Sequence, residues 1–108
     1  MEEMAEHTLL IVEDENIIRD GLVGSIPWQE YGFRLVGAAS DGEEAMEIIR
    51  ASAPDAVITD IKMPRKDGLE LLKCIRRVAP KTEVVILSGY EEFEYAREGL
   101  KKGAFAYI

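Results

Sequence analysis

Acidic or hydroxyl side chains stand directly after three of the short apolar runs in this sequence. TLLIV is followed by Glu13 and Asp14, AVIT by Asp60, and EVVIL by Ser88. Burying an unpaired carboxylate is costly, so an acid at the end of a buried strand needs either a partner or a chemical role. Which of these applies depends on whether the fold brings the acids together.

Two hydrophobic periodicities alternate along the chain and predict the elements that would position these residues. Apolar runs rich in branched residues predict strands at 8–13, 34–39, 55–60, 83–88 and 104–108. Apolar residues three or four positions apart predict helices at 15–26, 43–51, 69–79 and 91–102. The patterns Ser40-x-x-Glu43 and Asp67-x-x-Glu70 are typical capping boxes and predict the starts of the second and third helices.

The alternation of strands and helices indicates an α/β fold. Strands of continuous apolar character favour a parallel sheet that is covered on both faces. Right-handed crossovers leave few topologies, of which we expect the flavodoxin-like doubly wound five-stranded order 2-1-3-4-5. Such a sheet needs a helix after the fifth strand, and the sequence ends before one. We therefore expect either a chain cut short, or a partner or swapped segment that covers this surface.

Composition limits the class of protein. The 108 residues suit one small domain, and we expect a flexible lead over residues 1–6 and one folded domain over 7–108. No apolar run reaches membrane-spanning length and the start, MEEMAEH, is acidic, which predicts a cytoplasmic protein without a membrane partner. A net charge of −8 argues against direct nucleic-acid binding by this chain. The single cysteine and single histidine, Cys74 and His7, exclude an internal disulfide and a structural zinc site.

The predicted topology places the acids at one site. Ligands of open parallel sheets bind beyond the carboxyl ends of the strands, and the first and third strands are neighbours, so Glu13, Asp14 and Asp60 should converge. Three carboxylates repel one another unless a proton or a cation intervenes. Mg²⁺ fits, because it takes one or two carboxylates and often bridges to a phosphoryl oxygen. Asp60 then suits covalent attack to give an aspartyl phosphate, and Ser88 can donate a hydrogen bond to a phosphoryl oxygen.

A simpler interpretation exists for each acid taken alone. An acid after a strand is usually a solvated turn residue or a helix cap, and Asp14 can be only the N-cap of the following helix. The coincidence of three acids on adjacent strand ends, with a hydroxyl on the next strand, favours a metal and phosphoryl site instead.

Four segments, LLIVEDE, VITDIKMPRKDGLELL, VVILSGY and GAFAYI, resemble in their order and spacing the receiver domain of two-component response regulators, the CheY-like family. The resemblance covers about residues 8–108. It implies that Asp60 accepts a phosphoryl group from a phosphohistidine on a sensor histidine kinase. It also implies that Mg²⁺ is bound by Asp14, Asp60 and the backbone carbonyl of Lys62, with Glu13 acting through a metal-bound water.

The resemblance also implies a conformational switch. Ser88 and Tyr107 match the family's switch pair, in which the hydroxyl turns toward the phosphoryl group and the aromatic ring swings inward. Lys62 and Tyr90 match the two positions that tune the lifetime of the phosphate. The domain would then be a phosphoacceptor with at most self-catalysed phosphorylation and dephosphorylation, and not an enzyme.

The sequence departs from the family pattern at its end. The family places a lysine just after the fifth strand, where it contacts the phosphoryl group and couples it to the switch, and this sequence ends before that position. Lys101 and Lys102 lie in the predicted fourth helix and are not assigned this role. We therefore expect weak phosphorylation or incomplete switching of the sequence as it stands.

An output domain is implied by a second, narrower resemblance. SIPWQEYGF and SGYEEFEYA together resemble receivers attached to AraC-type helix-turn-helix domains, which implies transcription control by a C-terminal DNA-binding domain. Tyr90, Phe93 and Tyr95 cannot all point inward from one helix. We expect at least one on the face of the fourth helix and fifth strand, where the family commonly forms homodimers. The simplest role for the aromatics around Trp28 is to pin their loop to the core, with a binding patch as the alternative.

Other functions remain open at this stage. A magnesium-dependent phosphohydrolase of the haloacid-dehalogenase type also uses a strand-end aspartate, but it needs a second aspartate at the position of Lys62. A flavin or nucleotide binder would need a Ser, Thr or Gly-rich phosphate loop where this chain has EDEN. A receiver-like interaction domain that is not phosphorylated is the third alternative, because of the absent lysine.

Overall fold

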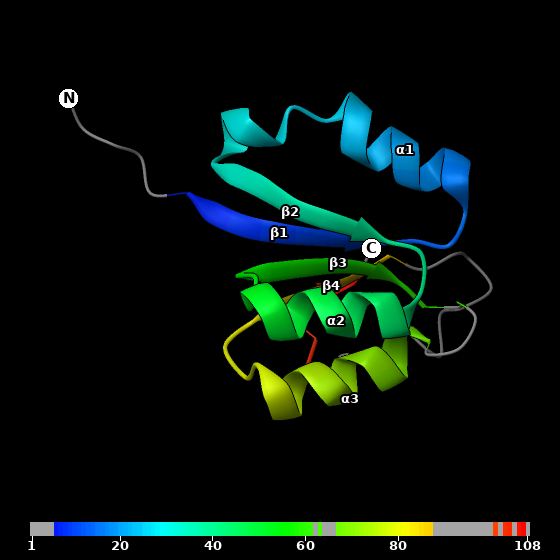
Figure 1. Cartoon of the computed structure of the whole chain (residues 1–108), viewed down its shortest axis with the longest axis vertical. Coiled ribbons are helices and arrows are strands. Elements are labelled where there is room, and N and C mark those ends of the chain that lie inside the picture. The colour runs from blue at the N-terminus through cyan, green and yellow to red at the C-terminus, as the bar shows by residue number, and fades with distance from the viewer. Residues whose placement is uncertain are drawn as a thin grey trace.

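The computed structural model describes residues 6–61, 63, 67–87, 101, 103–104 and 106–107. Five strands form one parallel sheet in the order β2-β1-β3-β4-β5 (Figure 1). The strands are β1 (His7–Val12), β2 (Phe33–Ala39), β3 (Ala56–Asp60), β4 (Glu83–Leu87) and β5 (Ala106–Tyr107). The predicted sheet and its strand order are confirmed.

Helices cover both faces of this sheet. α1 (Asn16–Ser25) lies on one face, and α2 (Gly42–Ser52) and α3 (Gly68–Val78) lie side by side on the other (Figure 1). All three begin within two residues of the predicted positions. The predicted fourth helix lies outside the described residues apart from Lys101. No helix in the described part of the chain is long and apolar enough to cross a membrane.

The main hydrophobic core lies between the sheet and the pair α2 and α3. Burial of an aliphatic side chain contributes roughly 1.5–3 kcal/mol, so this layer holds the sheet together. Its buried members are Leu10, Val12, Ala39, Ala45, Met46, Ile49, Val57, Ile61, Met63, Leu71, Leu72, Ile75, Val84 and Ile86. On the opposite face Leu9 and Ile11 of β1 are buried, but α1 itself has no buried residue, and Ile17 is 87% exposed. α1 is therefore the helix that burial holds least firmly.

The start of α2 differs by one residue from the prediction. The N-cap is Asp41, whose side chain accepts a hydrogen bond from Glu44 N at 2.8 Å. Ser40 donates through its backbone N and its Oγ to the carboxylate of Glu44, at 2.8 and 2.9 Å. The predicted pair Ser40 and Glu43 is thus wrong, because the overlapping pattern Asp41-x-x-Glu44 caps the helix.

Aromatic residues after α1 pin the loop to the rest of the domain, in agreement with the simpler interpretation. This segment includes the short 3-10 helix η1 (Trp28–Tyr31). The ring N–H of Trp28 donates to the carbonyl of Leu22 at 2.8 Å, and its ring meets that of Phe33 edge to face, with centroids 6.3 Å apart. Trp28 is half-buried, whereas Tyr31 is exposed.

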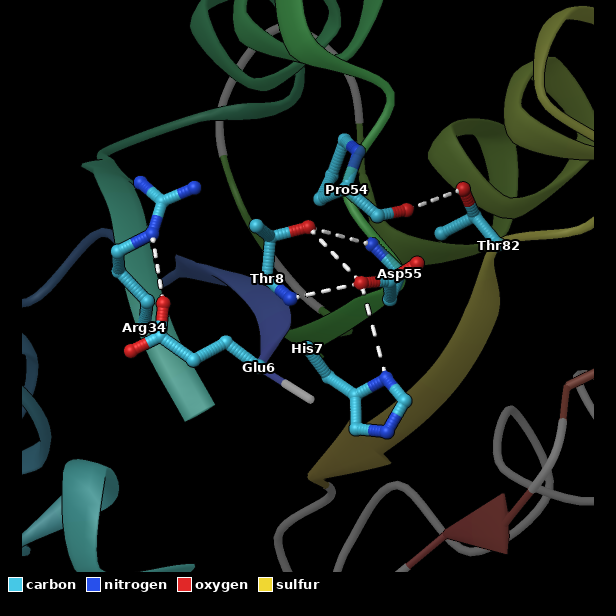
Figure 2. Close-up of polar contacts among 7 residues, drawn as sticks. All are labelled: Glu6, His7, Thr8, Arg34, Pro54, Asp55 and Thr82. Atoms are coloured by element: carbon cyan, nitrogen blue, oxygen red, sulfur yellow. Dashed lines mark hydrogen bonds and ion pairs between the residues drawn. The ribbon is translucent and has the colours of Figure 1, made fainter. Parts of the chain in front are cut away.

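Polar contacts fix the amino ends of β1 and β3 (Figure 2). Thr8 donates from its backbone N and its Oγ1 to the carboxylate of Asp55, at 2.8 and 3.2 Å, and Asp55 N donates to Thr8 Oγ1 at 2.9 Å. His7 Nδ1 lies 3.8 Å from the same carboxylate. Thr82 Oγ1 donates to the carbonyl of Pro54 at 2.6 Å, which ties β4 to this cluster. These bonds support the register in which Val12 pairs with Thr59 at the other end of the strands.

We predict that Asp55→Ala lowers the free energy of unfolding by about 1–2 kcal/mol, because Thr8 loses a charged acceptor that is only partly replaced by water. Urea unfolding followed by circular dichroism measures this change. Asp20→Ala, which removes the same charge from an exposed position on α1, is the control and should leave stability nearly unchanged. Equal stability of Asp55→Ala and the wild type would contradict the role assigned to this cluster.

Candidate metal centre

Three carboxylates meet at the carboxyl edge of the sheet. Oxygens of Glu13, Asp14 and Asp60 lie within 4.8 Å of one another. Glu13 and Asp14 follow β1, and Asp60 ends β3, which is the neighbour of β1. Among the described residues this is the one group of three or more acidic, histidine or cysteine side chains close enough to share an ion. The predicted convergence of the three acids is confirmed.

Glu13 is the most constrained of the three acids. It is 4% exposed, and its backbone N donates to the carbonyl of Ala39 in β2 at 2.9 Å. The pKa of its carboxyl is raised from 4.5 to about 7: burial is the largest cause, the neighbouring charges of Asp60 and Asp14 also raise it, and a 3.1 Å hydrogen bond from Glu15 N lowers it. A carboxyl that takes up a proton near neutral pH lies in a site that favours added positive charge.

Asp60 is held by the chain that follows it. Its Oδ1 accepts a hydrogen bond from Ile61 N at 2.8 Å, and Thr59 Oγ1 donates to the carbonyl of Asp60 at 2.8 Å. Ile61 is 1% exposed and Met63 is also buried, so both anchor the segment after β3 in the core. The half-buried carboxylate of Asp60 therefore has a fixed orientation at the edge of the sheet.

Asp14 has no capping role in the structure. The N-cap residue of α1 is Glu15, and no side chain accepts a capping hydrogen bond there. The alternative in which Asp14 only caps the helix is therefore wrong. Its position is explained instead by the cluster that it forms with Glu13 and Asp60.

Gly68 allows α3 to begin directly behind Asp60. A Cβ atom at position 68 would lie 2.4 Å from the carbonyl oxygen of Asp60 and 2.9 Å from the Cα of Ile61. Gly68 N donates to the carbonyl of Ile61 at 2.7 Å, and the predicted cap is confirmed, because Asp67 Oδ1 accepts from Glu70 N at 2.9 Å. No role for Gly68 was predicted from the sequence. A glycine in the first turn of a helix, where it is otherwise unfavourable, was the available signal.

Several predicted site residues cannot be placed. Lys62, Ser88 and Tyr90 lie outside the described residues, as do Phe93 and Tyr95 of the predicted dimer face. Tyr107 lies in β5, where its backbone pairs with Ile86 of β4, as the predicted fifth strand requires. The roles of these residues stay predictions.

The order of the strands and the acids at their ends agree with a known family. Residues 9–108 match the family model described as the response regulator receiver domain. The chain belongs to this family. The match includes residues of all five strands and favours a receiver domain over a haloacid-dehalogenase type hydrolase or a flavin-binding protein.

Relatives of this receiver domain include transcriptional regulators. It is 46% identical to the transcriptional regulatory protein YesN of Bacillus subtilis over an alignment of 102 residues. This alignment covers 94% of this chain and 28% of YesN. It is 43% identical over 100 residues to the transcriptional regulatory protein HptR of Staphylococcus aureus, covering 93% of this chain and 39% of that protein. The receiver domain thus spans well under half of the curated relatives that it matches.

Solved structures agree with this assignment. The receiver domain of AraT, a response regulator from Geobacillus stearothermophilus, superimposes with a TM-score of 0.88 at 38% identity, covering 94% of this chain and 79% of that one. A two-component transcriptional regulator AraC from Clostridium phytofermentans gives a TM-score of 0.81 at 36% identity, covering 95% and 78%.

The chemistry of the acidic cluster suits the ion that receiver domains bind. All three donors are carboxylates, which Mg²⁺ prefers, and sulfur and imidazole ligands, which favour zinc, are absent from the cluster. Burial is the main cause of the raised pKa of Glu13, and the negative charges of Asp60 and Asp14 add to it, so added positive charge is favoured here. The residues present therefore fit Mg²⁺.

We predict that Gly68→Ala destabilises the receiver domain by about 2–4 kcal/mol and weakens Mg²⁺ binding, because the new methyl group must push α3 away from Asp60. Urea unfolding and isothermal titration with Mg²⁺ measure the two effects. Gly24→Ala is a matched control, since a Cβ at this position in α1 would meet nothing within 4 Å. If Gly68→Ala were as stable as the wild type, α3 would be able to shift without a cost in free energy of unfolding.

The pKa of Glu13 predicts how stability depends on pH in the absence of metal. Because the folded-state pKa of about 7 lies above the ordinary 4.5, the contribution of Glu13 to stability is complete below about pH 4.5 and is lost as the pH rises through about 7. Glu13→Gln should therefore stabilise the metal-free domain by about 1–3 kcal/mol at pH 8 and by little at pH 5.

Urea unfolding with a chelator at both pH values tests this prediction. Glu15→Gln, which removes the same charge from an exposed neighbouring position, should show no such dependence on pH. Equal effects of Glu13→Gln at pH 5 and pH 8 would mean that Glu13 is ionised at both.

Proposed function

We propose that this receiver domain stores a signal as a phosphoryl group on Asp60, taken from a phosphohistidine of a sensor histidine kinase. Mg²⁺ would be held by Asp14, Asp60 and the backbone carbonyl of Lys62, with Glu13 acting through a bound water. The observation that carries this proposal is the cluster of three carboxylates from adjacent strand ends, within 4.8 Å of one another, in a chain that belongs to the receiver family.

Asp60 is the nucleophile in the proposed reaction. One of its carboxylate oxygens forms a bond to phosphorus while the bond between phosphorus and the histidine nitrogen breaks, and the imidazole keeps the electron pair of the broken bond. When bound, Mg²⁺ supplies the positive charge that lets an anionic phosphoryl group approach these acids. The hydrogen bond from Ile61 N to Asp60 Oδ1 orients the carboxylate for this attack.

Burial gives the other acids separate tasks. Glu13 is buried, its backbone N donates to the carbonyl of Ala39 in β2, and its carboxylate accepts a hydrogen bond from Glu15 N. It would therefore set the charge of the site without reaching the substrate. Asp14 is half-buried and thus less enclosed than Glu13, so it can bind the ion directly. Ser88 would donate a hydrogen bond to a phosphoryl oxygen, and Tyr107 would move inward when it does so.

The output is proposed to be transcription control. The domain would act in the cytoplasm, and phosphorylation would change the face of the fourth helix and β5, through which a homodimer forms. A C-terminal helix-turn-helix DNA-binding domain would then respond. Support comes from relatives that are named transcriptional regulators and from the similarity to a two-component regulator named AraC. Apart from self-catalysed gain and loss of phosphate, no enzymatic activity is proposed.

The deciding experiment is phosphorylation by a small phosphodonor in the presence of Mg²⁺. The protein is used in a form that continues past Ile108, so that the lysine expected after the fifth strand is included. Mass spectrometry should show an adduct of roughly 80 Da, the mass of one phosphoryl group. The adduct should disappear in Asp60→Ala and when Mg²⁺ is chelated.

Asp20→Ala is the matched control, because it removes an exposed aspartate from α1 and should be phosphorylated like the wild type. No adduct on the wild type would favour an interaction domain that is not phosphorylated. An adduct that persists in Asp60→Ala would assign the phosphoryl group to another residue.

A further inference from the structure

Arg19 reaches back from α1 over the loop that carries two of the acids. Its Nη1 donates to the carbonyl oxygen of Glu13 at 2.8 Å, and its Nη2 donates to Oδ1 of Asn16 at 2.5 Å. Glu13 and Asn16 are the two ends of the connection between β1 and α1. Because a guanidinium group is a rigid planar fork, one side chain holds both ends of this loop at a fixed separation.

The charge of Arg19 is not directed at the carboxylates of the cluster. Its two hydrogen bonds end on a backbone carbonyl and on a side-chain amide oxygen. A positive group used to neutralise the acids would instead bind one of their carboxylates, as Arg34 binds the carboxylate of Glu6 at 3.5 Å at the other end of the sheet (Figure 2). Arg19 therefore supports the backbone that presents Glu13 and leaves the acidic oxygens to another cation.

The rest of this loop has few other supports. The N-cap of α1, Glu15, makes no capping hydrogen bond through its side chain, and α1 has no buried residue to anchor the helix. At the start of the loop, Glu13 is buried and its backbone N donates to the carbonyl of Ala39 in β2 at 2.9 Å, and Glu15 N donates to the carboxylate of Glu13 at 3.1 Å. Burial fixes Glu13 at the start of the loop, but neither a buried residue nor a side-chain cap fixes the other end at α1, so the fork of Arg19 is the contact that ties this end to Glu13.

We propose that Arg19 is a positioning residue of the metal centre, which holds the β1–α1 loop so that the carboxylates of Glu13 and Asp14 face Asp60 before the ion arrives. This inference rests on the proposed function, because it assumes that Mg²⁺ binds among these acids. Groups that orient metal ligands without touching the metal typically change metal affinity by about 10–100-fold when removed.

The charge of Arg19 and its positioning role have opposite effects on Mg²⁺ binding. A nearby positive charge repels the ion, so if charge were its only effect, removal of the guanidinium would tighten binding. If Arg19 positions the ligands, its removal lets the loop relax and weakens binding. The sign of the change therefore distinguishes the two roles.

Isothermal titration of the folded protein with Mg²⁺ is the test, using Arg19→Met and Arg19→Lys. We expect Arg19→Met to weaken Mg²⁺ binding about tenfold. Arg19→Lys, which keeps the charge but lacks the planar fork, should also weaken it, though less. The matched control is Arg34→Met, which removes an equal charge from the opposite end of the sheet and should leave the affinity within about twofold.

A second readout separates positioning from damage to the fold. At saturating Mg²⁺, phosphorylation of Arg19→Met by a small phosphodonor should return close to the wild-type rate, because the ion then restores the arrangement of the ligands. If the Met variant does not fold, the Lys variant gives the affinity comparison. A rate that stays low at saturating Mg²⁺ would overturn the positioning role.

The outcomes also separate this inference from the proposed function. If wild-type protein binds Mg²⁺ and Arg19→Met binds it equally or more tightly, the inference is wrong and the metal centre stands. If the wild type binds no Mg²⁺, the metal centre itself is wrong, and the inference fails with it.

Discussion

The pairing of β1 with β3 is the constraint on which the candidate site depends. Their parallel register sets Val12 beside Thr59, so the next residues, Glu13 and Asp60, come out of the sheet next to each other. Both strands are held by the core that they share with α2 and α3. A shift of one residue would turn every apolar side chain of a strand to the wrong face, so the core fixes the register of the two strands. The same register places the negative charges of Glu13 and Asp60 next to each other.

The two ends of these strands use carboxylates in opposite ways. At the amino ends, Asp55 accepts hydrogen bonds from Thr8 and lies near His7, so its charge is compensated within the protein (Figure 2). At the carboxyl ends, burial and the neighbouring acids raise the pKa of Glu13 to about 7. One end of the sheet therefore contributes to stability, whereas the other favours added positive charge. This difference supports the proposed metal centre at the carboxyl edge.

The sequence predicted those features that depend on local pattern and on strand order. Apolar periodicity predicted the elements, parallel topology followed from their alternation, and the meeting of Glu13 with Asp60 followed from the topology. Features that depend on how a loop folds back against a strand end were missed. Gly68 is required by the approach of α3 to the backbone of Asp60. The hydrogen bond from Arg19 to the carbonyl of Glu13 depends on the path of a loop that no periodicity encodes. The cap of α2 was misplaced by one residue because two capping patterns overlap there.

The weak burial of α1 and the repulsion between the carboxylates of the cluster are physically connected. A ligand shifts a conformational equilibrium only by the difference in its affinity for the two states. A metal centre buried in a rigid core would have a single conformation, so binding could not shift a conformational equilibrium. Here Glu13 is buried and hydrogen-bonded to β2, but the loop after it is held to α1 by a few directional hydrogen bonds, and the charges of Asp14 and Asp60 add to the raised pKa of Glu13. Binding of a cation at this edge can therefore change the structure of the loop, while the core beneath α2 and α3 stays fixed.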